Sequence, residues 1–176
     1  MNIPLISYIF LKGRCAYCKE KISIQYPVVE FITGCAFLCL FLTFGLTFKT
    51  LFLCIILSLF IVLAATDILE TVILDYHAYI LLGIGLLYSL SGYSNISIIQ
   101  ALIGAVSGFI ILEVIARSGY LVANYRIFGE GDSLIALGLG AIFGLRDFLI
   151  IFTLSMIIQC LFAIPVLIIK AFKNKN

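Results

Sequence analysis

Charged residues are scarce in this sequence of 176 residues, with 11 lysines and arginines and 9 aspartates and glutamates, or 11% of the chain. Soluble domains carry about a quarter charged residues, so this shortage excludes an ordinary soluble domain. The net charge of +2 is too small to indicate binding to nucleic acid. What the chain does have is 64% hydrophobic residues and a mean hydropathy of +1.25. These values are typical of an integral membrane protein.

Metal-binding and disulfide-forming residues are also few. His77 is the single histidine and has no partners at metal-ligand spacing. Four of the six cysteines lie inside apolar runs: Cys35, Cys39, Cys54 and Cys160. A free thiol in such a run packs as a small hydrophobe, so we do not expect a disulfide framework. Only Cys15 and Cys18 form a spaced pair in a polar stretch.

Long apolar runs fill most of the chain after residue 27. They cover residues 28–47, 51–66, 78–92, 98–116, 133–145 and 148–169. A helix needs about 20 apolar residues to cross the hydrocarbon, so we predict an all-α integral membrane bundle of about six transmembrane helices. Pro27 suits the first turn of the first one. Residues 1–27 are predicted to form a short cytosolic basic arm with one Cys-x-x-Cys, and residues 28–176 the membrane-embedded domain.

The basic residues orient the predicted bundle. With a cytosolic N-terminus, one side of the membrane receives nine of them: Lys12, Arg14, Lys19, Lys21, Arg117, Arg126, Lys170, Lys173 and Lys175. The other side receives Lys49 and Arg146. Because basic residues favour the cytosolic side, both termini are predicted to be cytosolic. The same map places Asp67, Asp75 and Asp132 at the cytosolic surface.

Two of these aspartates lie at the ends of apolar runs, where an acid is a candidate for function. Asp67 closes the second run, and Asp132 follows two glycines and opens the fifth. Two carboxylates brought within a few ångströms share a proton and can activate a water and protonate a leaving amine, as in aspartic proteases. The alternative is that Asp132 merely caps a helix and Asp67 is a solvated acid.

Other features of the apolar runs have structural interpretations. Glu113 and Arg117 are four residues apart and are expected to form an ion pair on one helix face. The small-residue pairs Gly104/Gly108 and Gly140/Gly144 predict close contact between helices.

The motifs in order resemble the type IV prepilin peptidases. They are Cys15-Ala16-Tyr17-Cys18, then Tyr26-Pro27-Val28-Val29-Glu30, then Asp67 with Asp75 eight residues on, then Gly129-Glu130-Gly131-Asp132. The resemblance covers essentially the whole chain and includes the GxGD motif of membrane aspartic proteases. It implies that Asp67 and Asp132 are the catalytic pair and that residues 28–176 are a membrane-embedded aspartic peptidase domain.

The resemblance also implies a substrate and a location. The substrates would be type IV prepilins or prepilin-like pseudopilins, whose basic leader peptide is cleaved at the cytosolic face of the bacterial plasma membrane. Gly129, Gly131, Asp75 and Glu30 would bind the substrate or shape the site. For Glu30 the alternative is a favourable acid in the first turn of a helix.

The departures from the family concern the N-terminal region. Longer members carry a further span and a first Cys-x-x-C, so we interpret this chain as an N-terminally short form. Cys15 and Cys18 supply two of the four thiolates of a structural zinc site, which only a second chain or a further segment would complete. Proteolysis should need no cofactor. Methylation with S-adenosylmethionine, which the N-terminal region supports in longer members, is not expected of this chain.

Two other functions fit the acids. One is a small ion-coupled transporter with Asp67, Asp75 and Asp132 as a relay, although a carrier should show internal repeats and acids near the bilayer midplane. The other is a non-catalytic pilus or secretion assembly factor that keeps the groove of a peptidase without turnover.

Overall fold

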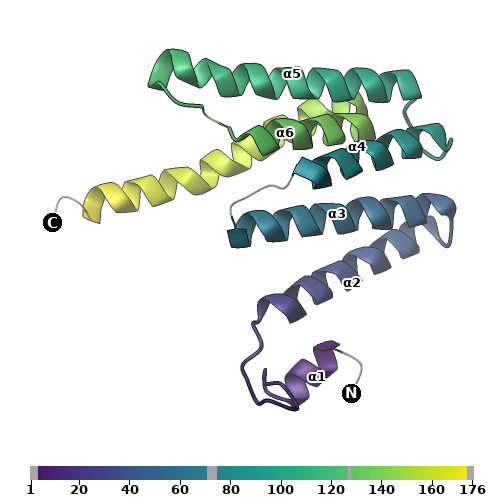
Figure 1. Cartoon of the computed structure of the whole chain (residues 1–176), viewed down its shortest axis with the longest axis vertical. Coiled ribbons are helices and arrows are strands. Elements are labelled where there is room, and N and C mark those ends of the chain that lie inside the picture. Colours follow the sequence, from purple (N-terminus) through teal and green to yellow (C-terminus); the bar gives the residue numbers. More distant parts are fainter. Residues whose placement is uncertain (1–3, 71–74, 127, 174–176) are drawn as a thin grey trace. The chain divides into compact units, whose positions relative to one another are not determined.

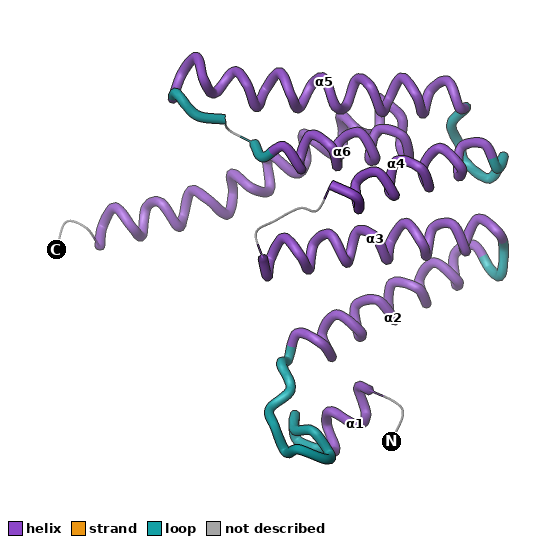
Figure 2. Tube along the Cα trace, viewed as in Figure 1, coloured by secondary structure: helices purple, strands orange, loops and turns teal. Residues whose placement is uncertain are grey.

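The computed structural model describes residues 4–70, 75–126 and 128–173, and these residues are almost entirely helices joined by short loops (Figures 1 and 2). Within these ranges the one extended pairing is an isolated antiparallel bridge between Arg14 and Lys21. The helices are α1 (Pro4–Phe10), α2 (Gln25–Phe44), α3 (Phe48–Glu70), α4 (Asp75–Leu90), α5 (Ile98–Ala123) and α6 (Glu130–Lys173). The predicted all-α class is confirmed.

All six predicted apolar runs are helical, but fewer helices have the dimensions of a membrane span. Four described helical stretches are long and apolar enough to cross a membrane: Gln25–Phe44, Phe48–Leu69, Ile98–Leu121 and Glu130–Ala163. Helix α4 has 16 residues, which at 1.5 Å per residue is shorter than the hydrocarbon core of about 30 Å. The protein is therefore a helical membrane protein, while the count of six spans and the cytosolic termini stay predictions.

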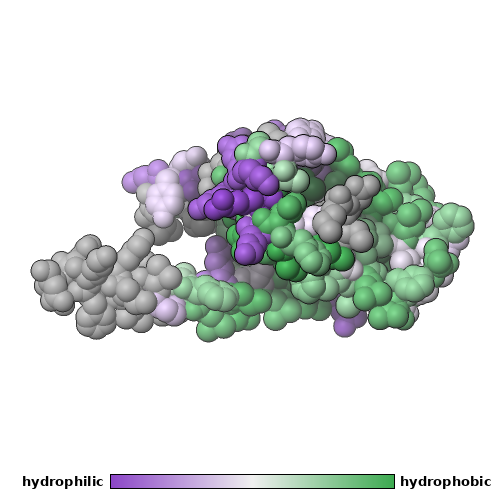
Figure 3. Space-filling model, turned by 90° about the horizontal axis from the view of Figure 1, so that it is seen from below, coloured by the Kyte–Doolittle hydropathy of each residue, from purple (hydrophilic) through white to green (hydrophobic). Residues whose placement is uncertain are grey.

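The surface agrees with a lipid environment. Apart from a cluster of hydrophilic residues, most of the coloured surface visible in Figure 3 is hydrophobic. Large side chains such as Leu102, Val106 and Ile110 of α5 are about half exposed in the isolated chain. Lipid tails are the solvent that such a surface requires.

Helix α6 contains a sharp reversal at Gly144, whose φ of 72° lies outside helical values. Ala136 and Phe148 belong to one buried cluster with Leu112. A straight helix would separate residues 136 and 148 by about 18 Å, so the chain must turn back between them. Glycine allows the positive φ at this turn without the clash of a Cβ atom. The two arms of α6 correspond to the predicted runs 133–145 and 148–169.

The chain divides into two compact units, which we describe separately. The first unit covers residues 1–72 and contains α1, α2 and α3. Helices α2 and α3 are joined at Gly45, whose φ is 65° and whose carbonyl accepts a hydrogen bond of 2.7 Å from Thr50 Oγ1. Pro27 lies in the first turn of α2, as predicted. The predicted boundary at residue 27 concerns the position of the membrane and stays a prediction.

The second unit covers residues 73–176. In it, helix α5 packs against helix α6. A Cβ atom on Gly104 would collide with the carbonyl oxygen of Gly140, and one on Gly108 would lie 2.8 Å from that of Ala136. The predicted close contact of the glycine pairs is confirmed for these residues. Gly144 takes part in the same contact, because a Cβ atom on Gly104 would lie 2.7 Å from its Cα atom, and it also forms the reversal.

Helix α4 packs on the same arm of α6. A Cβ atom on Gly138 would meet the side chain of Leu81 at 2.8 Å, and one on Gly85 would meet Ile142 at 2.8 Å. Leu81 is fully buried. The first arm of α6, which begins two residues before Asp132, is therefore held on both sides by glycine contacts.

Candidate active site

Asp132 is the third residue of α6 and is partly exposed. Its Oδ2 atom accepts a hydrogen bond of 3.0 Å from the backbone N–H of Gly129, just before the helix. An acid at this position that reaches back to the helix start forms half of a capping box. The described residues provide no hydrogen bond to the other carboxylate oxygen, Oδ1. Asp132 therefore caps its helix with one oxygen and keeps the second for other chemistry.

Among the described residues the glycines with positive φ are Gly13, Gly45, Gly92 and Gly144, so neither glycine of the GxGD motif has a positive φ. A Cβ atom on Gly129 would lie 3.5 Å from Asp132 Oδ2, an ordinary contact distance. At Gly129 the missing side chain keeps the space beside the carboxylate open.

A charged cluster lies next to this helix start. Glu113, on α5, pairs with Arg117 at 2.7 Å, which confirms the predicted i,i+4 ion pair. Glu113 also receives two hydrogen bonds from Arg126, of 3.2 Å from Nη1 and 2.7 Å from Nη2. Arg126 lies in the loop that leads to α6, and its side chain is 17% exposed. No sequence motif assigns Arg126 to the site, although an acid such as Glu113 inside an apolar run is a signal for a polar partner.

Asp67 lies in the last turn of α3, which continues beyond it to Glu70. Its side chain is exposed. The neighbouring residues Ala64, Ala65 and Ile68 line an apolar groove of about 310 Å³ between α2 and α3. Thr66 Oγ1 donates to the carbonyl of Leu63 at 3.0 Å, so the hydroxyl turns back to its own helix.

Asp75 and Glu30 occupy other helix ends. Asp75 is the first residue of α4 and is exposed, and residues 71–74 before it lie outside the described ranges. Glu30 is half-buried in the second turn of α2, which corrects the alternative that placed it in the first turn. It lines a cavity of about 180 Å³ together with Tyr8 and Arg14.

The candidate catalytic pair is divided between the two units. Asp67 belongs to the first unit, whereas Asp75 and Asp132 belong to the second. The meeting of the Asp67 and Asp132 carboxylates stays a prediction, for which we give an experiment below.

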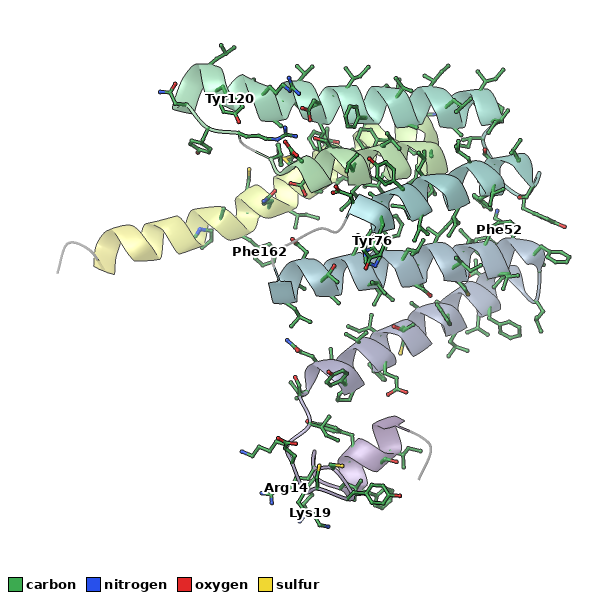
Figure 4. The ribbon with its side chains drawn as sticks, viewed as in Figure 1. Arg14, Lys19, Phe52, Tyr76, Tyr120 and Phe162 are labelled. Carbon is green, nitrogen blue, oxygen red and sulfur yellow. The ribbon has the colours of Figure 1, made fainter. Side chains whose placement is uncertain are left out.

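Cys15 and Cys18 lie on a tight turn between α1 and α2. Figure 4 shows Arg14 and Lys19, which flank the pair, on this loop. The backbone N–H of Cys15 donates to the carbonyl of Glu20 at 2.9 Å, and that of Lys19 to the carbonyl of Cys15 at 3.1 Å. Hydrogen bonds from the backbone N–H groups of Cys18 and then Tyr17, and from the Cys18 side chain, lower the pKa of the Cys15 thiol. The turn therefore stabilises a thiolate.

The described residues do not complete a metal site. No group of three or more histidine, cysteine, aspartate or glutamate side chains comes together within the ranges 4–70, 75–126 and 128–173. Cys15 and Cys18 supply two ligands, and a structural zinc ion requires four.

The fold and the position of these residues define a class of helical membrane protein with an acid held by a glycine motif at a helix start. Comparison with known proteins gives the family. The model of the type IV leader peptidase family matches residues 54–164, and that of the bacterial peptidase A24 N-terminal domain matches residues 1–44. The chain belongs to the type IV leader peptidase family.

Curated relatives support this assignment. The chain is 35% identical over 143 residues to the prepilin leader peptidase/N-methyltransferase of Pectobacterium carotovorum subsp. carotovorum, covering 81% of this chain and 51% of the relative. It is 30% identical over 169 residues to the protein of that name from Aeromonas salmonicida (strain A449), covering 96% and 58%. It is 31% identical over 169 residues to the protein of that name from Neisseria gonorrhoeae, and the match covers 96% of this chain and 59% of the relative.

The chain spans between 51% and 59% of the length of these three relatives. No solved structure matches it significantly.

Proposed function

We propose that this chain is a membrane-embedded aspartic endopeptidase that cleaves the basic leader peptide from type IV prepilins or prepilin-like proteins. The observation that carries the proposal is the family match over residues 54–164, which includes both Asp67 and Asp132. The relatives are named prepilin leader peptidase/N-methyltransferase, which supports prepilins as the substrate class. The transporter and the non-catalytic assembly factor are not favoured, because the family is one of peptidases.

The proposed mechanism assigns the two carboxylates different tasks. Asp132 lies in the first turn of α6, and its Oδ1 atom has no hydrogen bond among the described residues. Asp132 is proposed as the general base that takes a proton from the attacking water. Asp67 lies in the last turn of α3. It is proposed as the acid that protonates the leaving amine when the peptide bond breaks.

Water attack by two carboxylates needs no metal and no cofactor. We propose that cleavage proceeds without zinc and without S-adenosylmethionine. Cys15 and Cys18 would hold zinc only with ligands from another chain or segment. Asp75, Glu30, Gly129 and Gly131 are proposed to bind the substrate or shape the site.

The proposed location is the bacterial plasma membrane with the site facing the cytosol. It is supported by the distribution of lysine and arginine, nine of which fall on the predicted cytosolic side. A basic leader would there remain in the compartment in which prepilins are made.

The test is cleavage of a prepilin in vesicles that also contain the purified chain. We expect Asp67→Asn and Asp132→Asn each to lower the rate by at least about 100-fold, because each removes one proton-transfer group. Asp147→Asn is the matched control. Asp147 is an exposed acid in the same unit as Asp132 and lies just after the reversal at Gly144. Its replacement should leave the rate unchanged. Full turnover by either of the first two variants would remove the pair from the mechanism.

A further inference from the structure

The loop before α6 is fastened to α5 by a single arginine. Arg126 donates from Nε to the carbonyl oxygen of Phe128 at 2.7 Å. The same guanidinium donates from both Nη atoms to the Glu113 carboxylate, 13 residues earlier in the chain. Two parallel bonds between arginine and a carboxylate fix both distance and orientation. Arg126 therefore holds the segment just before the GxGD motif against α5.

The residue after Asp132 is fastened to the same carboxylate. Ser133 is buried, with 1% of its surface exposed. Its Oγ atom donates to Glu113 Oε2 at 3.0 Å and lies 3.3 Å from Arg126 Nη2, from which it accepts. Glu113 thus receives bonds from both sides of the motif. We call Glu113, Arg126 and Ser133 the Glu113 clamp.

Asp132 lies between the two points that the clamp fixes. On one side its carboxylate accepts from the N–H of Gly129, the residue after Phe128. On the other side Ser133 is the next residue in α6. The geometry points to the Glu113 clamp as the device that positions the Asp132 carboxylate, and this inference rests on the proposed function. Glu113, Arg126 and Ser133 would act as positioning residues, since none of them is required to touch the substrate.

If Arg126 only stabilised the fold by pairing with Glu113, then Arg117, which pairs with the same carboxylate, would have the same role. The contacts of the two arginines differ. Arg117 also bonds Glu113 at 2.7 Å, but its side chain is 72% exposed, against 17% for Arg126. Among the described residues Arg117 forms its hydrogen bond and ion pair with Glu113 and none with residues 126–133. An exposed ion pair contributes little to stability, whereas removing one partner of a shielded pair leaves an uncompensated charge. Arg117 is therefore a matched control for Arg126: both bond Glu113, but only Arg126 also holds the loop before α6.

The test compares Arg126→Gln, Glu113→Gln and their double variant with Arg117→Gln in the full-length chain. Arg126→Gln and Glu113→Gln are expected to lower kcat by about 100-fold with little change in KM, because a misplaced carboxylate slows chemistry without weakening substrate binding. The double variant should lose no more than the single variants, since the clamp works as one unit. Arg117→Gln should keep the kcat of the unaltered chain.

Two milder variants cover the case in which Arg126→Gln does not fold. Arg126→Lys keeps the charge but not the paired bonds, and Ser133→Ala removes only the bonds of Ser133. Each should show an intermediate loss of kcat. Full kcat in both would overturn the clamp, as would an equal loss in Arg117→Gln.

Amide hydrogen exchange separates this inference from the proposed function. Arg126→Gln should accelerate exchange across residues 128–133, including the Gly129 amide, whereas Arg117→Gln should not. If the unaltered chain does not cleave prepilin, the proposed function fails and exchange still tests the clamp. If the chain cleaves but exchange in residues 128–133 is unchanged by Arg126→Gln, only the clamp fails.

Discussion

Asp132 combines a helix-capping contact with the proposed role in catalysis. Oδ2 closes the helix start by accepting from Gly129, and Oδ1 has no bond among the described residues. The helix-capping role, which was the alternative for Asp132, is therefore compatible with its proposed role as a general base. Asparagine at position 132 would keep an oxygen for the cap but could not act as a base, which makes it a sharper test than alanine.

The thiol of Cys15 gives a prediction of pH dependence. Its pKa is lowered by the N–H groups of Cys18 and Tyr17 and by the Cys18 side chain. A lowered pKa gives more thiolate at neutral pH, so alkylation of Cys15 should reach its midpoint at lower pH in the folded chain than in the denatured chain. The stability linked to this thiolate is fully present above the unfolded pKa and is lost as pH falls through the folded one.

Iodoacetamide labelling over a pH series, read by mass spectrometry of the Cys15 peptide, measures this midpoint. An equal or higher midpoint in the folded chain would show that the turn does not stabilise the thiolate. Labelling of Cys18, which is exposed on the same turn, provides an internal reference for access to the reagent.

Some residue contacts could be predicted from the sequence and others could not. The Glu113–Arg117 pair followed from a spacing of four on one helix. The pairing of Glu113 with Arg126 joins residues 13 apart through a loop, and no periodicity specifies such a contact. The role of Ser133 was missed for the same reason, because a serine beside an acid has no pattern of its own.

At the scale of helices, glycines decide which surfaces touch. Gly104→Ala is expected to destabilise the protein by about 1–3 kcal/mol, because the added methyl group would meet backbone atoms that cannot move aside. The matched control is Gly83→Ala in α4, where nothing lies within 4 Å of the added atom. There alanine should be neutral or stabilising, because it favours helix.

Unfolding of both variants in detergent micelles, followed by circular dichroism, measures the difference. If the Gly104→Ala and Gly83→Ala variants have the same unfolding midpoint, α5 and α6 do not make the close contact described at Gly104.

Hydrophobic runs predicted the helices well, since each run is helical. They did not predict the length of α3 past Asp67 or the existence of α1, because polar and short segments carry little hydrophobic signal. The predicted runs 133–145 and 148–169 place the break at residues 146 and 147. The reversal is instead made by Gly144, because an L-residue with a side chain rarely adopts its positive φ.

At the scale of the whole molecule, the proposed chemistry requires the two units to bring their acids together. In a chain with the native cysteines replaced, we expect Asp67→Cys and Asp132→Cys to be joined by a short bifunctional thiol reagent. A pair of Asp67→Cys and Asp147→Cys should not be joined, because the arm of α6 from residue 132 to the reversal is about 18 Å long.

Gel mobility after cleavage of a protease site inserted between the units detects the link. Equal linking of both pairs, or none of the first, would contradict the meeting of the carboxylates. The sequence could propose this meeting through the family resemblance, whereas helix periodicity alone carries no information on the distance between two units.

The hairpin in α6 has a practical consequence for where the end of the protein emerges. Its first arm runs about 21 Å from Glu130 to Gly144, and the chain then returns through Ala163 over about 28 Å. An outgoing arm followed by a returning one brings the later residues back toward the level of Asp132. A fluorescent tag fused after Asn176 should therefore lie in the same compartment as the proposed site of leader-peptide cleavage.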